Sequence, residues 1–170
     1  MMNFSAKIPL HMKPDDTDWA LLAALQHDAA QSNQALAERA GISPPTALRR
    51  VRRLHDEGLI SAQVALLDED RVAALQGHGL TAIVEVTLDR QGAEHQDAFE
   101  RRAVADDAVR QCYRVAPGPD FVLLLRVPDM PAYQRLAERL FTQDANVRNV
   151  RAFFSVKRAK FETQVPLVRG

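Results

Sequence analysis

One stretch constrains the fold of this chain more than any other, the run over residues 43–60 that opens with a serine and two prolines and carries four arginines. Ser43 is suited to cap a helix whose first turn tolerates proline, because the first N–H groups of a helix have no intrahelical acceptor. Gly58 is suited to end that helix. The helical spacing predicts a buried face and an opposite polar face, formed by Ala47, Leu48, Val51 and Leu54 and by Thr46, Arg49, Arg50 and Arg53. Because neighbouring arginines repel one another, the polar face is expected to meet an anion.

A shorter helix is expected just upstream, from Ser32 as its N-cap to Ala40, and a sharp turn over residues 41–43 separates the two helices. Two short helices joined in this way predict a helix-turn-helix, whereas an ordinary charged helical hairpin is the alternative. Arg49, Arg50 and Arg53 are expected to face the major groove, and Arg52 is expected to contact phosphate. The predicted DNA-contacting residues are Ser32, Asn33, Ser43, Pro44, Thr46, Arg49, Arg50, Arg52 and Arg53.

A third helix is expected before these two. Asp15 can cap it with Asp18 three residues later, because negative charge is favoured at a helix N-terminus. Its buried face is expected to consist of Trp19, Leu22, Leu25 and Ala29. The net formal charge of the 170-residue chain is zero. Nonspecific attraction to DNA should therefore be weak, which favours a dimer that makes two half-contacts.

Several other classes of function find little support in the sequence. The single Cys112 cannot form an intramolecular disulfide and is expected to be a packed small hydrophobe, with a redox role as the alternative. The five histidines lack metal-site spacing, so no catalytic residue, metal or cofactor is expected. No apolar run approaches the roughly 20 residues of a membrane span, and the N-terminus lacks a signal-peptide core. The cytoplasm and no membrane partner are expected.

The pattern after Gly58 predicts a strand over residues 59–67 that acts as a wing and a linker. From Leu80 onward it predicts a βαββαβ order over residues 80–88, 94–104, 109–116, 121–127, 130–141 and 150–157. The expected fold class is α+β, with a ferredoxin-like second domain whose antiparallel sheet has two helices on one face. The expected divisions are a mobile arm over 1–13, a winged helix-turn-helix over 14–62, a linker strand over 63–78, the βαββαβ domain over 79–160 and a tail over 161–170.

The predicted sheet has apolar residues on both sides. Those that cannot all point at the helices are Val84, Val86, Val122, Leu124 and Phe154. A second copy of the chain would cover the open side, so a two-fold homodimer is expected, sheet against sheet, with residues 62–67 of the two copies paired. Its two arginine-bearing helices would enter successive major grooves of a roughly palindromic double-stranded operator.

Motifs in both domains resemble those of the Lrp/AsnC (feast/famine) transcription regulators. They are Asp15 and Asp18 before Leu21-Leu22, Leu36-Ala37, Gly41-Ile42-Ser43-Pro44, Arg50-Val51-Arg52-Arg53-Leu54, Gly58, Ile60 and Arg126-Val127-Pro128-Asp129-Met130. The resemblance implies a winged helix-turn-helix joined by a linker strand to a ligand-sensing, oligomerising domain. It also implies dimers that often assemble into octamers, and small amino acids as the usual effectors.

The chain departs from this family where the resemblance places the effector, between dimers at the turn that joins the second and third strands of the sensing domain. Members commonly carry Gly-Asp-x-Asp-Tyr there, whereas this chain has two prolines, each of which removes an N–H donor. The positions that the resemblance assigns to the effector are Ala116, Gly118, Asp120, Phe121, Val150 and Ala152. Members often carry Thr or Ser on the last strand, where this chain has Val150 and Ala152. A polar amino acid would lose hydrogen-bond partners there, so a larger apolar effector, another metabolite or no effector is expected. Asp120 as a simple turn cap is the alternative.

The function expected from these features is sequence-specific, DNA-binding transcriptional regulation, modulated by a small amino acid or a related metabolite. The two-domain architecture also resembles that of sirohaem decarboxylases, which place histidines in the sensing domain for haem chemistry. None lies on the predicted strands over 109–116, 121–127 and 150–157, so enzyme activity is not expected. An effector-less architectural regulator is the remaining alternative.

Overall fold

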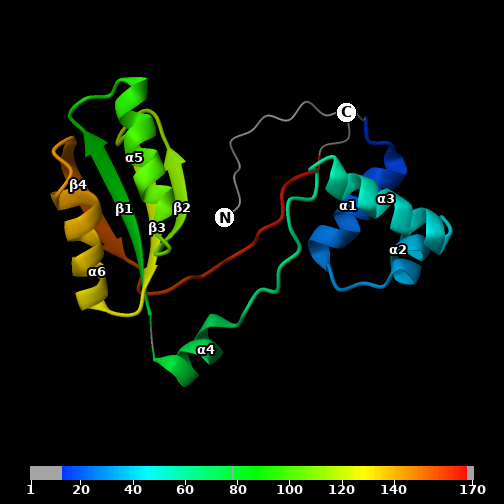
Figure 1. Cartoon of the computed structure of the whole chain (residues 1–170). Coiled ribbons are helices and arrows are strands. Elements are labelled where there is room, and N and C mark those ends of the chain that lie inside the picture. Colours follow the sequence, from blue (N-terminus) through cyan, green and yellow to red (C-terminus); the bar gives the residue numbers. More distant parts are fainter. Residues whose placement is uncertain (1–12, 78, 168–170) are drawn as a thin grey trace. The chain divides into compact units, whose positions relative to one another are not determined.

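The computed structural model describes residues 13–77 and 79–167, and it divides the chain into two compact units (Figure 1). The first unit runs up to Leu66 and includes the chain from Lys160 onward, and the second spans Leu67–Ala159. The arm expected over 1–13 lies, apart from Lys13, outside the described residues. The boundaries expected at 62, 78 and 160 stay predictions.

The first unit is a three-helix core. It contains α1 (Asp16–His27), α2 (Asn33–Ala40) and α3 (Pro44–Asp56), as the sequence predicts. Its buried apolar residues are Leu21, Ala24, Leu25, Leu36, Ala37, Ala47 and Leu54. The face expected of α1 is only partly right, because Trp19 and Leu22 are half-buried and Ala29 is exposed beyond the helix end. Asp18 shares the buried face with Leu21 and Leu25, and this polar residue obscured the apolar period.

Caps define the ends of these helices. The Ser32 hydroxyl accepts from the Ala35 amide at 3.2 Å, which confirms Ser32 as the N-cap of α2. Gly58 has φ +74°, and the Leu59 amide donates to the Leu54 carbonyl at 3.0 Å, so Gly58 ends α3 as predicted. Ser43 occupies the N-cap position of α3, but its hydroxyl bonds the Thr46 hydroxyl at 2.8 Å and makes no cap bond to the backbone.

The strand predicted after α3 is absent from the single chain. Residues 61–68 carry no helix or strand, and α4 (Glu69–Gln76) follows them. A strand requires a hydrogen-bonded neighbour, and one chain supplies none here. The side chain of Asp68 accepts from the Arg71 amide at 3.1 Å and caps α4.

Ion pairs hold α4 in the second unit. Glu69 pairs with Arg126 on β3 (Phe121–Val127) and with Arg158 at 2.6 Å. The pKa of Glu69 lies below its ordinary value, chiefly because of the hydrogen bond from Arg126. Burial opposes this effect, and the hydrogen bond from Arg158 lowers the pKa further. The start of α4 is therefore attached to the end of the sheet.

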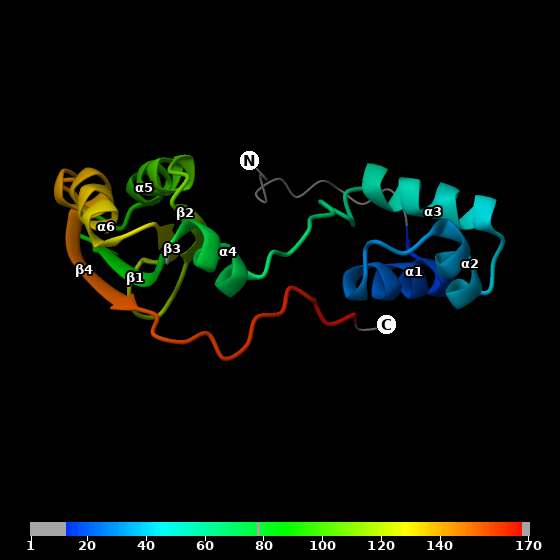
Figure 2. The same cartoon turned by 90° about the horizontal axis from the view of Figure 1, so that it is seen from below.

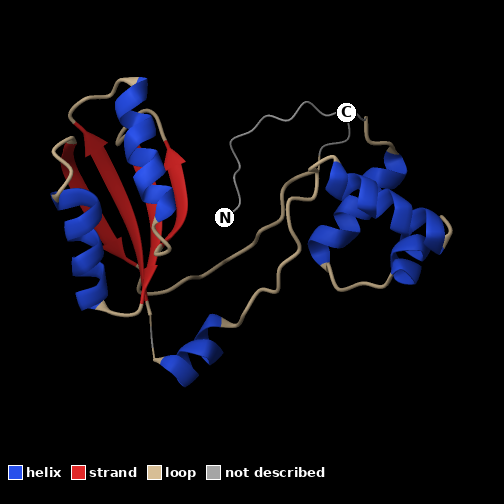
Figure 3. Ribbon diagram, viewed as in Figure 1, coloured by secondary structure: helices blue, strands red, loops and turns tan. Residues whose placement is uncertain are grey.

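The second unit is the predicted ferredoxin-like fold, so the expected α+β class is confirmed. Besides β3 it contains β1 (Leu80–Leu88), α5 (Ala93–Ala105), β2 (Val109–Arg114), α6 (Met130–Ala137), a short π-helix η1 (Glu138–Thr142) and β4 (Val147–Phe154). The antiparallel sheet has the order β2-β3-β1-β4. Helices α5 and α6 lie on one face of it (Figures 2 and 3). The last strand begins three residues before its predicted start at 150, because the polar residues Arg148 and Asn149 hid the alternation.

The register separates the two faces of the sheet. Val86 lies opposite Phe121 and Val150, and Val84 lies opposite Leu123 and Ala152, in rows that pack beneath the helices. The alternate residues lie on the other face, where side chains of β1, β2, β3 and β4 include Ile83, Tyr113, Val122, Leu124 and Phe153. Ile83, Tyr113 and Phe153 are 43%, 53% and 45% exposed. The prediction that apolar side chains occupy both faces is confirmed.

Candidate nucleic-acid interface and effector site

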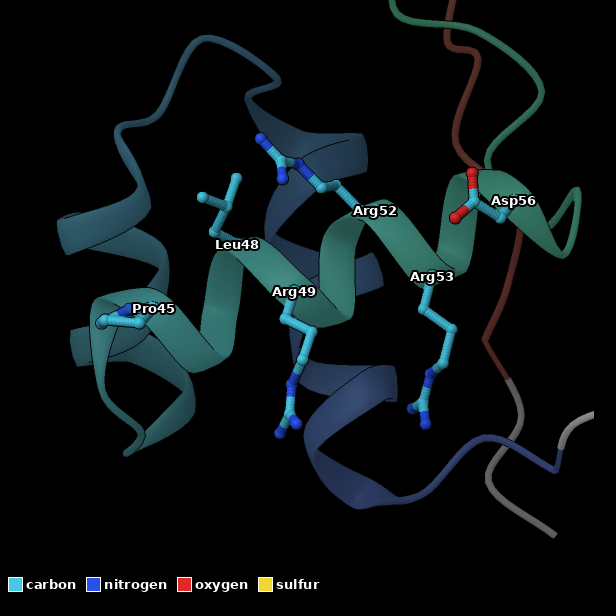
Figure 4. Close-up of a pocket in the computed structure, with 6 residues that line it drawn as sticks. All are labelled: Pro45, Leu48, Arg49, Arg52, Arg53 and Asp56. Atoms are coloured by element: carbon cyan, nitrogen blue, oxygen red, sulfur yellow. The ribbon is translucent and has the colours of Figure 1, made fainter.

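The outer surface of α3 carries a shallow groove of about 400 Å³. It is lined by Pro45, Leu48, Arg49, Arg52, Arg53 and Asp56 (Figure 4). Arg49 and Arg53 extend to one side of the helix, and Leu48 and Arg52 extend to the other. The accessible face of α3 is therefore cationic, as the sequence predicts, with one apolar side chain among the cations.

That apolar side chain, Leu48, was expected in the buried stripe, and this expectation is wrong. Ala47 and Leu54 are fully buried and Val51 packs beside them. These three residues, at positions i, i+4 and i+7, form the whole face that α3 turns to the core of the first unit. Leu48 is one residue, about 100° around the helix, away from Ala47. This places it at the border of the two faces, where it lines the groove instead of joining the core cluster.

Arg50 was expected to face the major groove of DNA, but its side chain turns toward the start of α1 and does not line the groove on α3. Its Nη1 donates to Asp15 Oδ2 at 2.7 Å and to Asp18 Oδ1 at 2.9 Å, and its side chain is only 23% exposed. The pKa of Arg50 is raised by these hydrogen bonds, first to Asp15 and then to Asp18. The pKa of Asp15 is lowered, first by the hydrogen bond that its carboxylate accepts from the Asp18 amide and then by the hydrogen bond from Arg50. Arg50 thus joins α3 to the start of α1.

Arg53 completes this network from the next turn of α3. Its Nη2 donates to both carboxylate oxygens of Asp18, at 3.0 and 2.8 Å. The Asp18 side chain is 1% exposed and also accepts from the Asp15 amide at 3.1 Å, as half of the capping box. The signal for this contact was in the sequence, because Asp15 and Asp18 share the three-residue spacing of Arg50 and Arg53.

The remaining residues predicted to touch DNA lie at helix starts. Ser43 and Thr46 are brought together by their hydroxyl hydrogen bond, and Pro44 beside them is exposed. Ser32 and Asn33 are exposed at the first residues of α2. Amides at a helix start favour phosphate, so all of these positions suit a nucleic-acid backbone.

Asp120, the charged residue assigned to the effector, is buried with its acceptors engaged. Its Oδ2 accepts from the Leu88 amide at 2.7 Å, and its own amide donates to the Val86 carbonyl at 2.9 Å. The side-chain amides of Gln91 and Gln96 reach its two oxygens at 3.4 Å each. Its exposed fraction is 6%. Within one chain Asp120 ties the turn to the end of β1, which supports the reading of Asp120 as a structural residue.

The other residues assigned to the effector fall into three environments in a single chain. Phe121 is fully buried against Phe99, with ring centroids 4.8 Å apart. Val150 and Ala152 are half-buried beneath the helices. Ala116 and Gly118 are exposed in the turn, where Gly118 has φ +128°. Their role in binding an effector stays a prediction.

Cys112 packs against the sheet core from β2, as expected of a small hydrophobe. Its burial, with a smaller effect of Glu100 and an opposing effect of Arg114, raises the pKa of the thiol to about 11. The protonated thiol is a poor nucleophile at neutral pH. In the described part of the chain, no three His, Cys, Asp or Glu side chains are grouped as metal ligands. No helix there is long and apolar enough to cross a membrane.

Two family models match the two units. The model of winged helix-turn-helix DNA-binding domains matches residues 14–61. The model of the Lrp/AsnC ligand binding domain matches residues 81–165. These matches agree with the core of α1, α2 and α3 in one unit and with the four-stranded sheet in the other.

Curated relatives match over almost the whole chain. The leucine-responsive regulatory protein of Rhizobium meliloti is 33% identical, covering 90% of this chain and 96% of its own. The Bkd operon transcriptional regulator of Pseudomonas aeruginosa is 31% identical over 90% of this chain and 97% of its own. The DNA-binding transcriptional activator DecR of Escherichia coli is also 31% identical, over 90% and 98%. All three are transcriptional regulators, and none supports the sirohaem decarboxylase alternative.

Solved structures match in the same way. An AsnC family transcriptional regulator from Agrobacterium tumefaciens has a TM-score of 0.78 at 27% identity, covering 90% of this chain and 97% of its own. A transcriptional regulator from Neisseria meningitidis, solved as a complex with L-Met, has a TM-score of 0.78 at 27% identity, over 91% and 97%. The helix-turn-helix and the sheet domain thus occur together in these regulators as they do in this chain.

Proposed function

We propose residue roles for this chain from one premise: it belongs to the Lrp/AsnC family of transcriptional regulators. It is a DNA-binding regulator with a ligand-binding domain, and not an enzyme. The observation that carries the residue roles is the division of the α3 arginines between the outer groove and the Asp15–Asp18 network. A cytoplasmic location fits a protein whose target is DNA.

In this proposal Arg49 and Arg52 read bases, because both are exposed and line the groove on α3. For Arg52 this replaces the phosphate contact expected from the sequence. A guanidinium can bind guanine bidentately, and Leu48, on the same side of α3 as Arg52, can contact a thymine methyl group. Arg50 instead positions α3 through Asp15 and Asp18, and Arg53 combines this positioning with a partly exposed side chain. Ser32, Asn33, Ser43, Pro44 and Thr46 are assigned to the phosphate backbone.

Replacing Arg52 with alanine is expected to weaken operator binding by about 1 to 3 kcal/mol and to change the preferred base at one position of each half-site. The thermal stability should stay at the wild-type value, because Arg52 makes no ion pair among the described residues. Selection of preferred sites from a randomised operator, combined with gel shifts at fixed salt, measures both effects. Arg71→Ala, at an 89% exposed side chain on α4, is the matched control.

Arg50→Ala separates this proposal from the sequence-based assignment. If Arg50 positions α3, the variant loses thermal stability and weakens binding to all sequences alike. Relaxed specificity at one base pair with unchanged stability would instead assign base reading to Arg50, and the proposed division of the arginines would be wrong.

The chain is proposed to act as a homodimer through the open face of its sheet. Ile83, Tyr113 and Phe153 leave an apolar surface there, and a second sheet would bury it. The linker supports the same assembly, because Val64, Leu66 and Leu67 are 65%, 63% and 70% exposed and lack a partner strand among the described residues. Two copies would present two α3 helices to a roughly palindromic operator, and further assembly to an octamer would follow the family pattern.

The effector is proposed to be an amino acid with a large apolar side chain, bound between dimers at the turn over residues 116–121. The support is the L-Met complex of the meningococcal regulator and the apolar Val150 and Ala152 of this chain. A ligand can act here only if it binds one quaternary arrangement better than another. An effector-less regulator remains the second candidate, because the turn lacks two N–H donors.

A screen of the twenty amino acids by thermal shift tests the effector assignment. L-Met or another large apolar amino acid at 100 times its Kd is expected to add roughly 2.7 kcal/mol to the stability of the assembly. Ala116→Lys, at the exposed turn, should abolish that shift and leave the stability of the ligand-free protein unchanged. The absence of a shift with any of the twenty would favour the effector-less regulator.

A further inference from the structure

The sheet domain carries a second cationic depression, remote in sequence from α3, with a volume of about 360 Å³. It lies where β3 ends and α6 begins, at the opposite end of β3 from the turn over residues 116–121. Its apolar lining includes Pro128 and Ala132. Four arginines from β2, β3, α6 and η1 line it: Arg110, Arg126, Arg135 and Arg139. We call this depression the arginine pocket.

Two of these arginines already have carboxylate partners. Arg126 pairs with Glu69, and Arg139 donates from Nε to Asp106 Oδ2 at 3.1 Å. Arg110 and Arg135 are exposed and make no ion pair with any residue that the structure describes. The arginine pocket therefore holds two guanidinium groups that form no ion pair among the described residues. One carboxylate, that of Asp107, also lines the pocket.

The backbone places Arg110 in the arginine pocket by a β-bulge. Val109 lies opposite Leu125 and Gln111 lies opposite Leu124, so Arg110 is an extra residue in β2. Pairing continues on the other side of the bulge, where the Arg126 amide donates to the Ala108 carbonyl at 2.8 Å. Bulges redirect a side chain away from the regular alternation and recur beside functional sites.

We propose that the arginine pocket binds a small organic anion whose carboxylate or phosphate group is held by Arg110 and Arg135 and whose carbon chain lies on Pro128 and Ala132. The planar guanidinium group of arginine can bind two oxygens of a carboxylate or of a phosphate at once. The apolar lining favours an organic anion over an inorganic one, because it offers contact area to carbon atoms. This ligand is a second one, separate from the amino acid proposed at the turn.

Isothermal titration of the full-length protein at low salt tests the proposal, with succinate, phosphoglycolate and inorganic phosphate as anions and succinamide as the neutral control. Succinate or phosphoglycolate is expected to bind more tightly than inorganic phosphate, and succinamide is expected not to bind. Arg110→Gln and Arg135→Gln should each weaken the Kd about tenfold or more. Asp107→Asn should tighten it about twofold to threefold, because it removes a like charge from the site.

Arg148→Gln, at a 71% exposed side chain of β4, is the matched control for a change in net charge and should leave the Kd unchanged. Tighter binding of succinate identifies the preferred group as a carboxylate, whereas tighter binding of phosphoglycolate, which carries one carboxylate and one phosphate, shows that the phosphate group is preferred to a second carboxylate. If neither organic anion binds the wild type, or if the Arg110→Gln/Arg135→Gln double variant binds like the wild type, the proposal is wrong. The assay contains no DNA and no amino acid, so its outcome is independent of the roles proposed for α3 and for the turn.

Discussion

Asp18→Ala is expected to destabilise the three-helix unit by about 3 kcal/mol. The substitution removes a buried carboxylate that accepts from Arg50 and Arg53, and it also removes half of the capping box of α1. Hydrogen bonds to a charged group contribute about 1.5 to 3 kcal/mol each and a cap about 1 kcal/mol, and the partial exposure of both arginines reduces the sum. Because α3 loses its attachment to α1, binding to every operator should weaken together.

Urea unfolding followed by the fluorescence of Trp19 measures this effect. Trp19 is the single tryptophan of the chain and neighbours Asp18 on α1, so its signal reports the first unit alone. Asp16→Ala, at an exposed carboxylate in the same first turn, is the matched control and should shift the urea midpoint by much less. An Asp18→Ala variant that unfolds at the wild-type midpoint would show that the network contributes no stability.

Ile83→Lys is expected to weaken the proposed sheet-to-sheet dimer at least about a hundredfold. A charge at the centre of an apolar face that meets its own copy is buried twice in each dimer, and an unpaired buried charge costs several kcal/mol. Ile83 lies opposite Leu124 and Phe153, in the middle of the open face. Operator affinity should fall with the loss of the dimer, because one α3 helix supplies only half of the contacts.

Sedimentation velocity at micromolar concentration measures the assembly of this variant. Val104→Lys is a closely matched control, since Val104 is 44% exposed and Ile83 is 43% exposed, but Val104 lies on α5 and not on the sheet. Val104→Lys should sediment like the wild type. If Ile83→Lys also did so, the open face of the sheet would not be the dimer interface.

The sequence was sufficient where a residue's environment depends on its own element. Strands β1 and β3 have their predicted bounds, because each alternates between a covered face and an open face. Helix α2 was predictable from Ser32 and from Gly41, whose φ of +66° suits the sharp turn. Local caps and local periodicity thus determined most of the fold.

The errors arose where the partner lies far along the chain. The partners of Arg50 are 32 and 35 residues away, so periodicity within α3 could place Arg50 on a face but could not identify what it meets. Asp120 accepts from the Leu88 amide, also 32 residues away, and the turn motif alone could not identify this partner. The predicted strand over residues 59–67 lacks a neighbour in one chain, so its pairing with a second copy stays a prediction.

The carboxylate that Arg50 and Arg53 share has a practical consequence for redesign. A graft that moves only α3 from one regulator into another would separate the arginines from Asp15 and Asp18, which belong to the start of α1. The grafted helix would then lack these hydrogen bonds even if every base-contacting residue were correct. The smallest segment that carries DNA specificity between such regulators is therefore the continuous stretch from residue 15 to residue 58, and hybrids should be joined at those two ends.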